Sequence, residues 1–212
     1  MGRGMTATPP HATPAHARLA TPEDTAALAD LARRAVSAKF QHLYKPEDFA
    51  TFMEAAHSDA KVAKEIADPG MRVAVIEEAG ALVAFCKLVL QSTLPGEYSE
   101  ARAPLELKQL YTDPARIGGG LGARLMDWAL GEAERVGADE IQLTVYSENP
   151  EAQRFYHRYG FAKIADIEFW VGNHCDPEFL YARPLTPKAT SESLGRESDG
   201  PETHGHAGTE RV

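Results

Sequence analysis

The stretch "LKQLYTDPARIGGGLGARLMDWAL" at residues 107–130 decides the fold, because a strand, a glycine-rich loop and a helix follow one another in it. Gly118, Gly119, Gly120 and Gly122 stand directly before apolar residues at helical spacing. The first N–H groups of a helix have no partner within it, and the helix dipole favours negative charge there. A tight turn alone would need one or two glycines. Because glycines also let an anion approach the backbone closely, the stretch predicts a phosphate-binding site.

Two common phosphate-binding motifs fit this loop poorly. A P-loop continues with Gly-Lys-Ser/Thr, whereas Gly122 is followed here by alanine and arginine. A dinucleotide fingerprint can be placed on Gly118, Gly120 and Ala123. That fingerprint requires an acidic residue at the end of the next strand, and the next strand-like run has none before Glu148.

The order of the other elements predicts a mixed α/β fold. Helical patterns begin after Thr21, at Pro46 and after Ser58, and strand-like runs at 71–78 and 81–91 flank an Ala79-Gly80 turn. The rest of the chain predicts a strand at 105–112, a helix at 121–136, a strand at 141–147, a helix at 150–159 and final strands at 161–172 and 178–185. Helices would therefore pack on a central sheet of about six to seven strands. The apolar phase shifts between Leu107 and Leu110, which predicts a β-bulge.

Composition separates the middle of the chain from its ends. Residues 1–17 and 186–212 contain few large apolar side chains, so we expect disordered tails around one folded domain at 18–185. The net charge of −9 argues against nucleic acid as a partner, and it is compatible with a cationic substrate or with solubility alone. The two cysteines form no disulfide framework, and no apolar run has the length of a signal or membrane-spanning segment. We therefore expect a cytoplasmic protein with no membrane partner.

Two segments, in this order, resemble the motifs of the GNAT superfamily of acetyl-CoA-dependent N-acetyltransferases. The stretch at 107–130 is similar to its pyrophosphate-binding motif, Gln/Arg-x-x-Gly-x-Gly/Ala before a helix. The segment "LTVYSENPEAQRFYHRYGFAKI" at 143–164 is similar to its Asn-x-x-Ala-x-x-Phe-Tyr-x-x-x-Gly-Phe segment. The matching residues there are Asn149, Ala152, Phe155, Tyr156, Gly160 and Phe161. The resemblance covers 18–185 and implies the GNAT fold, in which the bulged strand splays away from its neighbour.

Other segments resemble one branch of that superfamily, the bacterial spermidine/spermine N-acetyltransferases of the Pai type. They are "SAKFQHLYKPEDFATFM" at 37–53, "ELKQLY" at 106–111 and "FWVGNHCDPEFLYARPL" at 169–185. This likeness implies an enzyme that transfers an acetyl group from acetyl-CoA to a primary amine, such as a polyamine, by direct attack in a ternary complex. Acetylation of a protein lysine or N-terminus stays open, as does a non-catalytic acyl-CoA-binding regulatory module. The sequence also leaves open a homodimer, as in many relatives.

The resemblance also implies roles for individual residues. The backbone of Leu110, Tyr111 and Thr112 would pair with the pantetheine arm, and the Leu110 N–H would face the acetyl oxygen. Tyr156 matches the general acid that protonates the coenzyme A sulfur, and Asn149 would bond the cofactor arm while capping its helix. The full set expected to contact acetyl-CoA is Leu110, Tyr111, Thr112, Ile117, Gly118, Gly119, Gly120, Leu121, Gly122, Ala123, Asn149, Ala152, Phe155 and Tyr156.

The acceptor amine needs a base or a desolvating pocket to remove its proton, because an alkylammonium has a pKa of about 10.4. Glu106 lies on the strand of Leu110, at a position where family members often carry an acidic residue that reaches the acceptor. Its alternative interpretation is a solvated strand glutamate. We therefore predict Glu106 as the catalytic partner of Tyr156, with the solvated alternative open.

Ile117 departs from the family pattern, and the run at 173–176 contains residue types that can bind metals. Ile117 stands where the family has Gln or Arg, so the backbone contact is kept and the side-chain contact is lost; Arg116 or Arg124 would supply charge nearby. The "NHCD" run at 173–176 carries ligand-type side chains. Adjacent positions on a turn rarely converge on one metal, so we expect no metal site.

Overall fold

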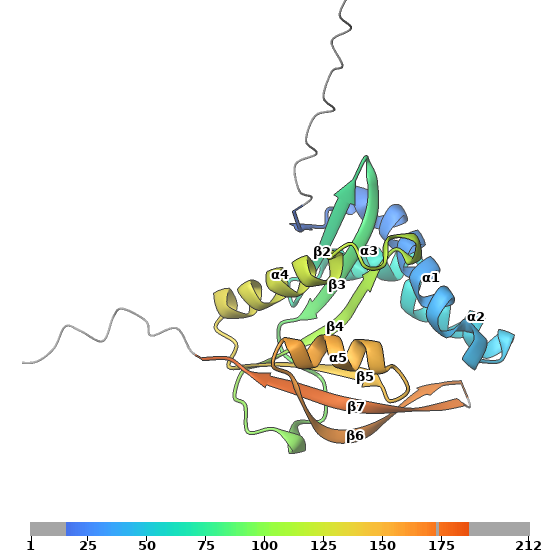
Figure 1. Ribbon diagram of the computed structural model, residues 1–212. Helices are drawn as coiled ribbons and strands as arrows, with labels where there is room; N and C mark the ends of the chain where they lie inside the picture. Colours follow the sequence, from blue (N-terminus) through green and yellow to red (C-terminus); the bar gives the residue numbers. More distant parts are fainter. Residues whose placement is uncertain (1–15, 173, 187–212) are drawn as a thin grey trace, which may run out of the picture.

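The described residues, 16–172 and 174–186 of a computed structural model, form helices and strands in the predicted order (Figure 1). The strands are β1 (Arg18–Leu19), β2 (Met71–Glu78), β3 (Ala81–Val89), β4 (Pro104–Thr112), β5 (Glu140–Tyr146), β6 (Ala162–Val171) and β7 (His174–Pro184). The α-helices are α1 (Thr25–Phe40), α2 (Pro46–His57), α3 (Asp59–Ala67), α4 (Leu121–Val136) and α5 (Pro150–Arg158). The strands build one mixed sheet in the order β1-β2-β3-β4-β5-β7-β6, which confirms the predicted fold class.

Short-range signals in the sequence set the ends of several helices. The chain enters α1 through a capping box, in which the Asp24 carboxylate accepts a hydrogen bond from the Thr21 N–H at 2.7 Å. Asn149 caps α5, because its side-chain oxygen accepts from the Ala152 N–H at 3.3 Å. Gly137, at φ 76°, ends α4 in the left-handed conformation that glycine adopts most readily.

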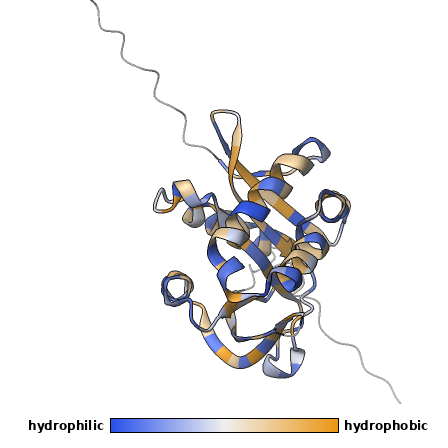
Figure 2. Cartoon of the chain, turned by 90° about the vertical axis from the view of Figure 1, so that its right-hand side faces the viewer, coloured by the Kyte–Doolittle hydropathy of each residue, from blue (hydrophilic) through white to orange (hydrophobic). Residues whose placement is uncertain are grey.

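The alternation of side chains along β2 divides the apolar core between the two faces of the sheet. Val73 and Val75 face α1 and α3, whereas Ala74 and Ile76 belong to the core that α4 covers. Successive side chains of a strand point to opposite faces, so a strand covered on both faces is apolar throughout. Figure 2 shows this hydrophobic colouring along the central strands, between helices that carry hydrophilic residues. Both faces of the sheet are therefore covered.

β4 carries the predicted bulge, and beyond it the sheet opens. Lys87 pairs with Gln109 and Leu88 with Leu107, which leaves Lys108 as the extra residue. In the described part of the chain, β4 pairs with β5 over Pro104–Glu106 alone, although β4 continues to Thr112. Past this short ladder the two strands diverge (Figure 1). The bulge and the splayed strand are therefore confirmed.

The last strand is longer than predicted. β7 begins at His174 rather than at residue 178, and it keeps Pro177 within the ladder opposite Glu168 on β6. The residues His174 to Asp176 therefore lie on a strand, and the interpretation of this run as a turn is wrong. A strand alternates its side chains, so Cys175 points away from the face that His174 and Asp176 share. Within 16–172 and 174–186, no three ligand-type side chains are grouped as a metal site would require.

The predicted tails and the expected absence of a membrane-spanning segment remain to be compared with the structure. Residues 1–15 and 187–212, which make up most of the predicted tails, lie outside them. Within them, no helix is both long enough and apolar enough to span a bilayer.

Candidate active site

The glycine loop leaves the start of α4 open. Gly118 and Gly120 have φ values of +89° and +74°, and a Cβ built on either one would meet no atom within 4 Å. These two glycines are therefore required by the backbone conformation, and the space beside them is free. The Arg124 N–H is bonded to the Gly120 carbonyl at 3.2 Å, so the first N–H groups of α4, at Leu121 to Ala123, precede the intrahelical ladder.

The splayed part of β4 offers a second row of backbone donors. The Asp113 N–H donates to the Val83 carbonyl on β3 at 2.8 Å. Backbone groups of a strand alternate between its two edges, so the N–H groups of Leu110 and Thr112 point the other way, into the gap towards β5. The gap is thus lined by backbone groups that a bound chain can pair with.

These features enclose a pocket of about 570 Å³ between β4, the glycine loop and α5. Of the residues predicted to contact acetyl-CoA, the pocket wall contains Leu110, Tyr111, Thr112, Ile117, Gly118, Gly120, Leu121, Gly122, Ala123, Asn149, Ala152, Phe155 and Tyr156. Gly119 does not line it, and Glu106 lines a different pocket. A ligand with phosphates and a slender amide-bearing arm suits this donor set, because backbone amides face both parts. We call it the cofactor pocket.

The positive charge of Arg116 at the mouth of the cofactor pocket is partly neutralised by an ion pair. Ile117 is 77% exposed, and the neighbouring Arg116 forms an ion pair with Glu78 at 3.1 Å. Arg116 also lines the pocket, whereas Arg124 does not. The departure at Ile117 therefore leaves the glycine loop to act mainly through its backbone.

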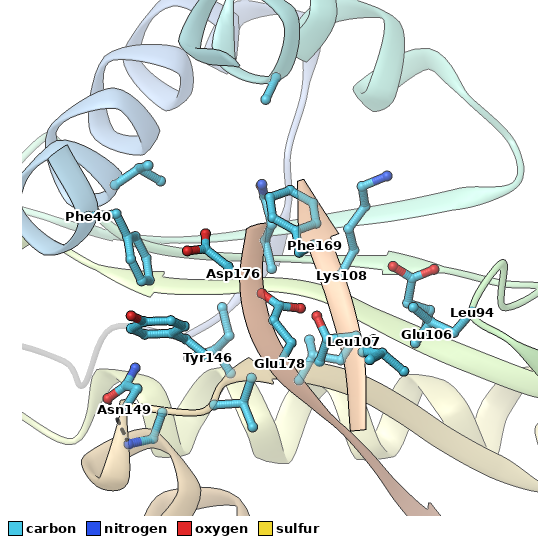
Figure 3. A pocket seen from close by; sticks show the side chains of 18 of the residues that line it. Phe40, Leu94, Glu106, Leu107, Lys108, Tyr146, Asn149, Phe169, Asp176 and Glu178 are labelled. Atoms are coloured by element: carbon cyan, nitrogen blue, oxygen red, sulfur yellow. Dashed lines mark hydrogen bonds between the residues drawn. The ribbon is translucent and has the colours of Figure 1, made fainter. Parts of the chain in front are cut away.

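A second pocket, of about 850 Å³, lies on the other side of the splay (Figure 3). We call it the acceptor pocket; its walls come from α1, α2, α3, the loop at 90–103 and strands β4 to β7. The residues that line both pockets are Phe40, Leu110, Tyr111, Asn149, Ala152 and Tyr156. The two pockets therefore meet, and we call this shared wall the junction.

Tyr156 stands at the junction and is fixed by aromatic neighbours. Its ring packs edge-on against Phe155, with centroids 5.4 Å apart, and against Phe161 at 5.8 Å. Burial raises the pKa of the Tyr156 hydroxyl, and the nearby Cys86 thiol adds to this increase. The hydroxyl is therefore protonated at neutral pH and available as a proton donor.

Two carboxylates of β7 form one wall of the acceptor pocket. Asp176 is 3% exposed; it accepts a hydrogen bond from the Tyr44 hydroxyl and contacts His174 Nε2 at 3.1 Å. Burial raises the pKa of Glu178, the Thr144 hydrogen bond opposes that increase, and the Asp176 charge adds to it. An acidic wall of this kind attracts a cationic ligand.

Glu106, the predicted base, also lies in the acceptor pocket. It is 7% exposed, and its Oε2 accepts from the Thr93 hydroxyl at 3.0 Å and from the Thr93 N–H at 3.4 Å. The same loop is tied down by the Ser92 hydroxyl, which donates to Gln142 at 2.7 Å. Glu106 is therefore buried rather than solvated, and it holds the loop at 90–103 in place.

Buried charge supports the end of the acceptor pocket at α2 and α3. Lys87 is fully buried, and its Nζ lies 2.6 Å from Glu65 Oε2. His57 is also fully buried, and neither of its ring nitrogens has a hydrogen-bond partner among the described residues. Burial, together with the charges of Lys87 and Arg33, lowers the pKa of His57 to about 4. This imidazole is therefore neutral at pH 7.

The sequence-based prediction missed most of the acceptor pocket. Phe40, Tyr44 and Tyr146 lie in segments that resemble the family, but the resemblance gave them no role, and they reach the pocket from separate elements. For β7 a signal exists: Asp176 and Glu178 share the strand face of Leu180, which is fully buried. Charged residues in phase with a buried leucine indicate a buried polar site.

Comparison with known proteins gives consistent matches. The family model for the acetyltransferase (GNAT) domain matches residues 40–172. An uncharacterized N-acetyltransferase of Mycobacterium tuberculosis is 31% identical over 140 residues, which is 66% of this chain and 84% of that protein. The residues matched by the family model include the glycine loop and the segment of Tyr156.

Solved structures show the same fold. The PaiA N-acetyltransferase of Thermoplasma acidophilum, in complex with coenzyme A, has a TM-score of 0.66 at 20% identity, over 82% of this chain and all 100% of that one. The putative acetyltransferase YncA of Salmonella typhimurium, with its cofactor acetyl-CoA, has a TM-score of 0.59 at 21% identity, over 86% of this chain and 100% of that one.

Proposed function

Because the chain belongs to the GNAT family of acetyltransferases, we propose that it acetylates a small primary amine at the junction, and that this amine is a polyamine. The coarser activity is that of the family: the chain is an acetyl-CoA-dependent N-acetyltransferase. In this proposal residues 18–185 form the catalytic domain.

The observation that carries the proposal is the charge and shape of the acceptor pocket. Its lining carboxylates outnumber its lysines: the acids are Glu65, Glu97, Glu106, Asp166, Glu168, Asp176 and Glu178, and the lysines are Lys61 and Lys108. The aromatic rings of Phe40, Tyr44, Tyr146 and Phe169 line the same space. Carboxylates bind ammonium groups, and aromatic faces attract cations and pack on alkyl chains, so an elongated polyamine matches both features.

The cofactor pocket supplies the other half of the reaction. Acetyl-CoA brings the acetyl group as a thioester. We assign the N–H groups at the start of α4 to its pyrophosphate and the backbone of Leu110 and Thr112 to its pantetheine arm, because the backbone groups of Tyr111, between them, face β3. The Leu110 N–H, which points into the splay, is the donor that we assign to the acetyl oxygen.

Two side chains are proposed to move protons. Tyr156 lies where the pockets meet, and its buried, protonated hydroxyl is the donor for the departing sulfur. The assignment of Glu106 as the general base stays a prediction; its place in the acceptor wall supports contact with a cationic acceptor, and its bonds to Thr93 support a structural role as well.

A thiol-release assay with acetyl-CoA tests the acceptor. Spermidine, spermine, a lysine peptide and an aminoglycoside should be compared at equal concentrations. We expect the highest kcat/KM for the polyamines, and a decrease at high salt, because screening weakens the attraction of the acidic wall. Preference for the lysine peptide would replace the polyamine by a protein acceptor, and acetyl-CoA binding without transfer to any amine would indicate a regulatory module.

A further inference from the structure

Glu178 on β7 is the carboxylate of the acceptor pocket that is best placed to meet the reacting amine. We infer that Glu178 binds the ammonium group that is to be acetylated and takes up its proton. The role of Glu178 rests on the proposed function, and it places a catalytic residue on β7, a strand for which the sequence analysis named no catalytic candidate.

Hydrogen-bond partners and burial together distinguish Glu178 from the other pocket carboxylates, because Glu97 and Glu168, which no ion pair holds among the described residues, are exposed whereas Glu178 is half-buried. Several of the other acids are held by a lysine, by a histidine or by a loop, whereas the hydrogen-bond partner of Glu178 within the described residues is the neutral Thr144 side chain. The held pairs are Glu65 with Lys87 at 2.6 Å, Asp166 with Lys163 at 2.7 Å, Asp176 with His174 at 3.1 Å and Glu106 with Thr93 at 3.0 Å. Glu178 can therefore accept a new cationic donor without giving up an ion pair.

Its position also favours the reacting end of the pocket. Figure 3 shows the Glu178 carboxylate pointing into the pocket between Tyr146 and Leu107, while Glu106 lies towards Leu94, on the side away from Asn149. Tyr111 belongs to the junction, and the Glu178 charge contributes to the raised pKa of the Tyr111 hydroxyl. Glu178 is thus electrostatically coupled to the wall that both pockets share.

The surroundings of Glu178 make it a stronger base than an exposed glutamate. Burial raises its pKa, and a carboxylate with a raised pKa holds a transferred proton more tightly. Ionisable groups face Glu178 from every strand around it. They are Asp176 on β7, Tyr111 and Lys108 on β4, Tyr146 on β5, Asp166 and Glu168 on β6, and Tyr44 before α2; the two β6 groups flank Ile167, which pairs with Glu178. Uptake of a proton there also relieves the repulsion between Glu178 and Asp176.

The proton and electron balance of the step is complete. An N–H bond of the substrate ammonium breaks, and its proton passes to the Glu178 carboxylate. The freed lone pair on nitrogen forms the C–N bond of the amide while the C–S bond of the thioester breaks. The sulfur keeps the electron pair of that bond and receives the Tyr156 proton. The acylated nitrogen then loses its second proton, which restores the Tyr156 hydroxyl, and Glu178 later releases its own proton to solvent, so no oxidant or further reactant is needed.

The test compares Glu178→Gln, which keeps the shape and the hydrogen-bonding ability of the side chain, with the wild type over pH 6 to 10. We expect kcat/KM for spermidine to fall about 100-fold at pH 7, with acetyl-CoA affinity unchanged. The loss should shrink towards pH 10, because a growing fraction of the amine is then neutral without a base. Titration calorimetry of spermidine into the free protein should show about tenfold weaker binding.

Two controls keep the result interpretable. Glu54→Gln removes a charge from the exposed surface of α2, outside both pockets, and should leave rates and binding unchanged. Thermal unfolding should show Glu178→Gln at least as stable as the wild type at pH 7. The reason is that the folded state holds the Glu178 proton more tightly than the unfolded state, so ionisation of this carboxyl at higher pH destabilises the fold.

The outcomes separate this inference from the proposed function. The role of Glu178 would be overturned if Glu178→Gln kept the wild-type rate and pH profile, while Glu106→Gln lost the decrease of kcat/KM at low pH that reports protonation of the base. If the wild type acetylates a different amine, the polyamine proposal fails, and the same comparison on that amine still decides the role of Glu178. Absence of transfer to every amine would overturn both.

Discussion

The two pockets that meet at Tyr156 are built in different ways. The cofactor pocket is made largely of backbone N–H groups and glycines from one continuous stretch, Leu110 to Ala123, with α5 closing it. The acceptor pocket is made of side chains from helices and strands far apart in the sequence, and it contains buried charge at Glu65, Glu106 and Asp176. A backbone site depends on local conformation, whereas a site of converging side chains depends on every element that positions them. The two should therefore respond differently to substitution.

The largest effect is expected where the acceptor pocket rests on buried charge. Glu65→Gln leaves the Lys87 ammonium buried without its counter-charge, so the free energy of unfolding should fall by about 3–5 kcal/mol in urea denaturation. Glu77→Gln is the control, because Glu77 pairs with Arg18 on the surface and should cost about 1 kcal/mol or less. Equal losses in the two variants would contradict the supporting role of the buried pair.

The next effect concerns the junction itself. Tyr156→Phe removes the proposed proton donor and keeps the ring, so kcat should fall about 100-fold while acetyl-CoA affinity is retained. Steady-state rates and direct binding measurements separate these two quantities. Tyr159→Phe, on the next turn of the chain, loses a hydroxyl that donates to the Ala123 carbonyl at 3.3 Å and should change kcat at most about twofold. An unchanged kcat in Tyr156→Phe would remove the residue from the mechanism.

A smaller effect probes the backbone character of the cofactor pocket. Gly120→Ala forces a side chain into φ +74° and places a methyl group beside the open helix start, so it should cost about 1–2 kcal/mol of stability. It should also weaken acetyl-CoA binding about tenfold. Gly131→Ala lies in the middle of α4, where a Cβ meets no atom within 4 Å, and should stabilise the protein by about 0.5–1 kcal/mol. Calorimetry and thermal unfolding report both effects, and the same sign in both variants would refute the distinction.

The smallest effect tests the departure from the family pattern. Ile117→Arg adds a cation at a position that is 77% exposed, so acetyl-CoA should bind about two- to fivefold more tightly at low salt. The gain should vanish near 1 M salt, where charges on the surface are screened. Ile117→Met is the neutral control. A gain that persists at high salt would mean that the side chain acts through contact rather than charge.

What could be predicted from the sequence follows the same division. The helix starts at Thr21 and Asn149, the bulge near Lys108 and the glycine loop all depend on residues close together in the chain, and all are present. The sequence analysis allowed a tight turn that needs one or two of the glycines, and the structure identifies those two as Gly118 and Gly120, which have positive φ values.

The acceptor pocket could not be predicted in the same way. Glu178 reaches it because β7 inserts between β5 and β6, and that order is a property of the whole sheet. The predicted strand began at Glu178, directly after Pro177, whereas β7 begins at His174 and includes Pro177. Tyr44 meets Asp176 across a large sequence separation for the same reason. Because the sheet order cannot be read from local sequence, the sequence does not show that these side chains line one pocket.

The short ladder between β4 and β5 has a consequence for the lifetime of the protein. A sheet whose middle strands pair only over Pro104–Glu106 is an incomplete one, and a bound arm along Leu110 to Thr112 would act as a temporary extra strand. The amides of Leu110 and Thr112 should then exchange with deuterium slowly when ligand is present and rapidly when it is not. At 100 times the dissociation constant, such a ligand adds about 2.7 kcal/mol to the unfolding free energy. Resistance to proteolysis would thus follow the supply of acetyl-CoA.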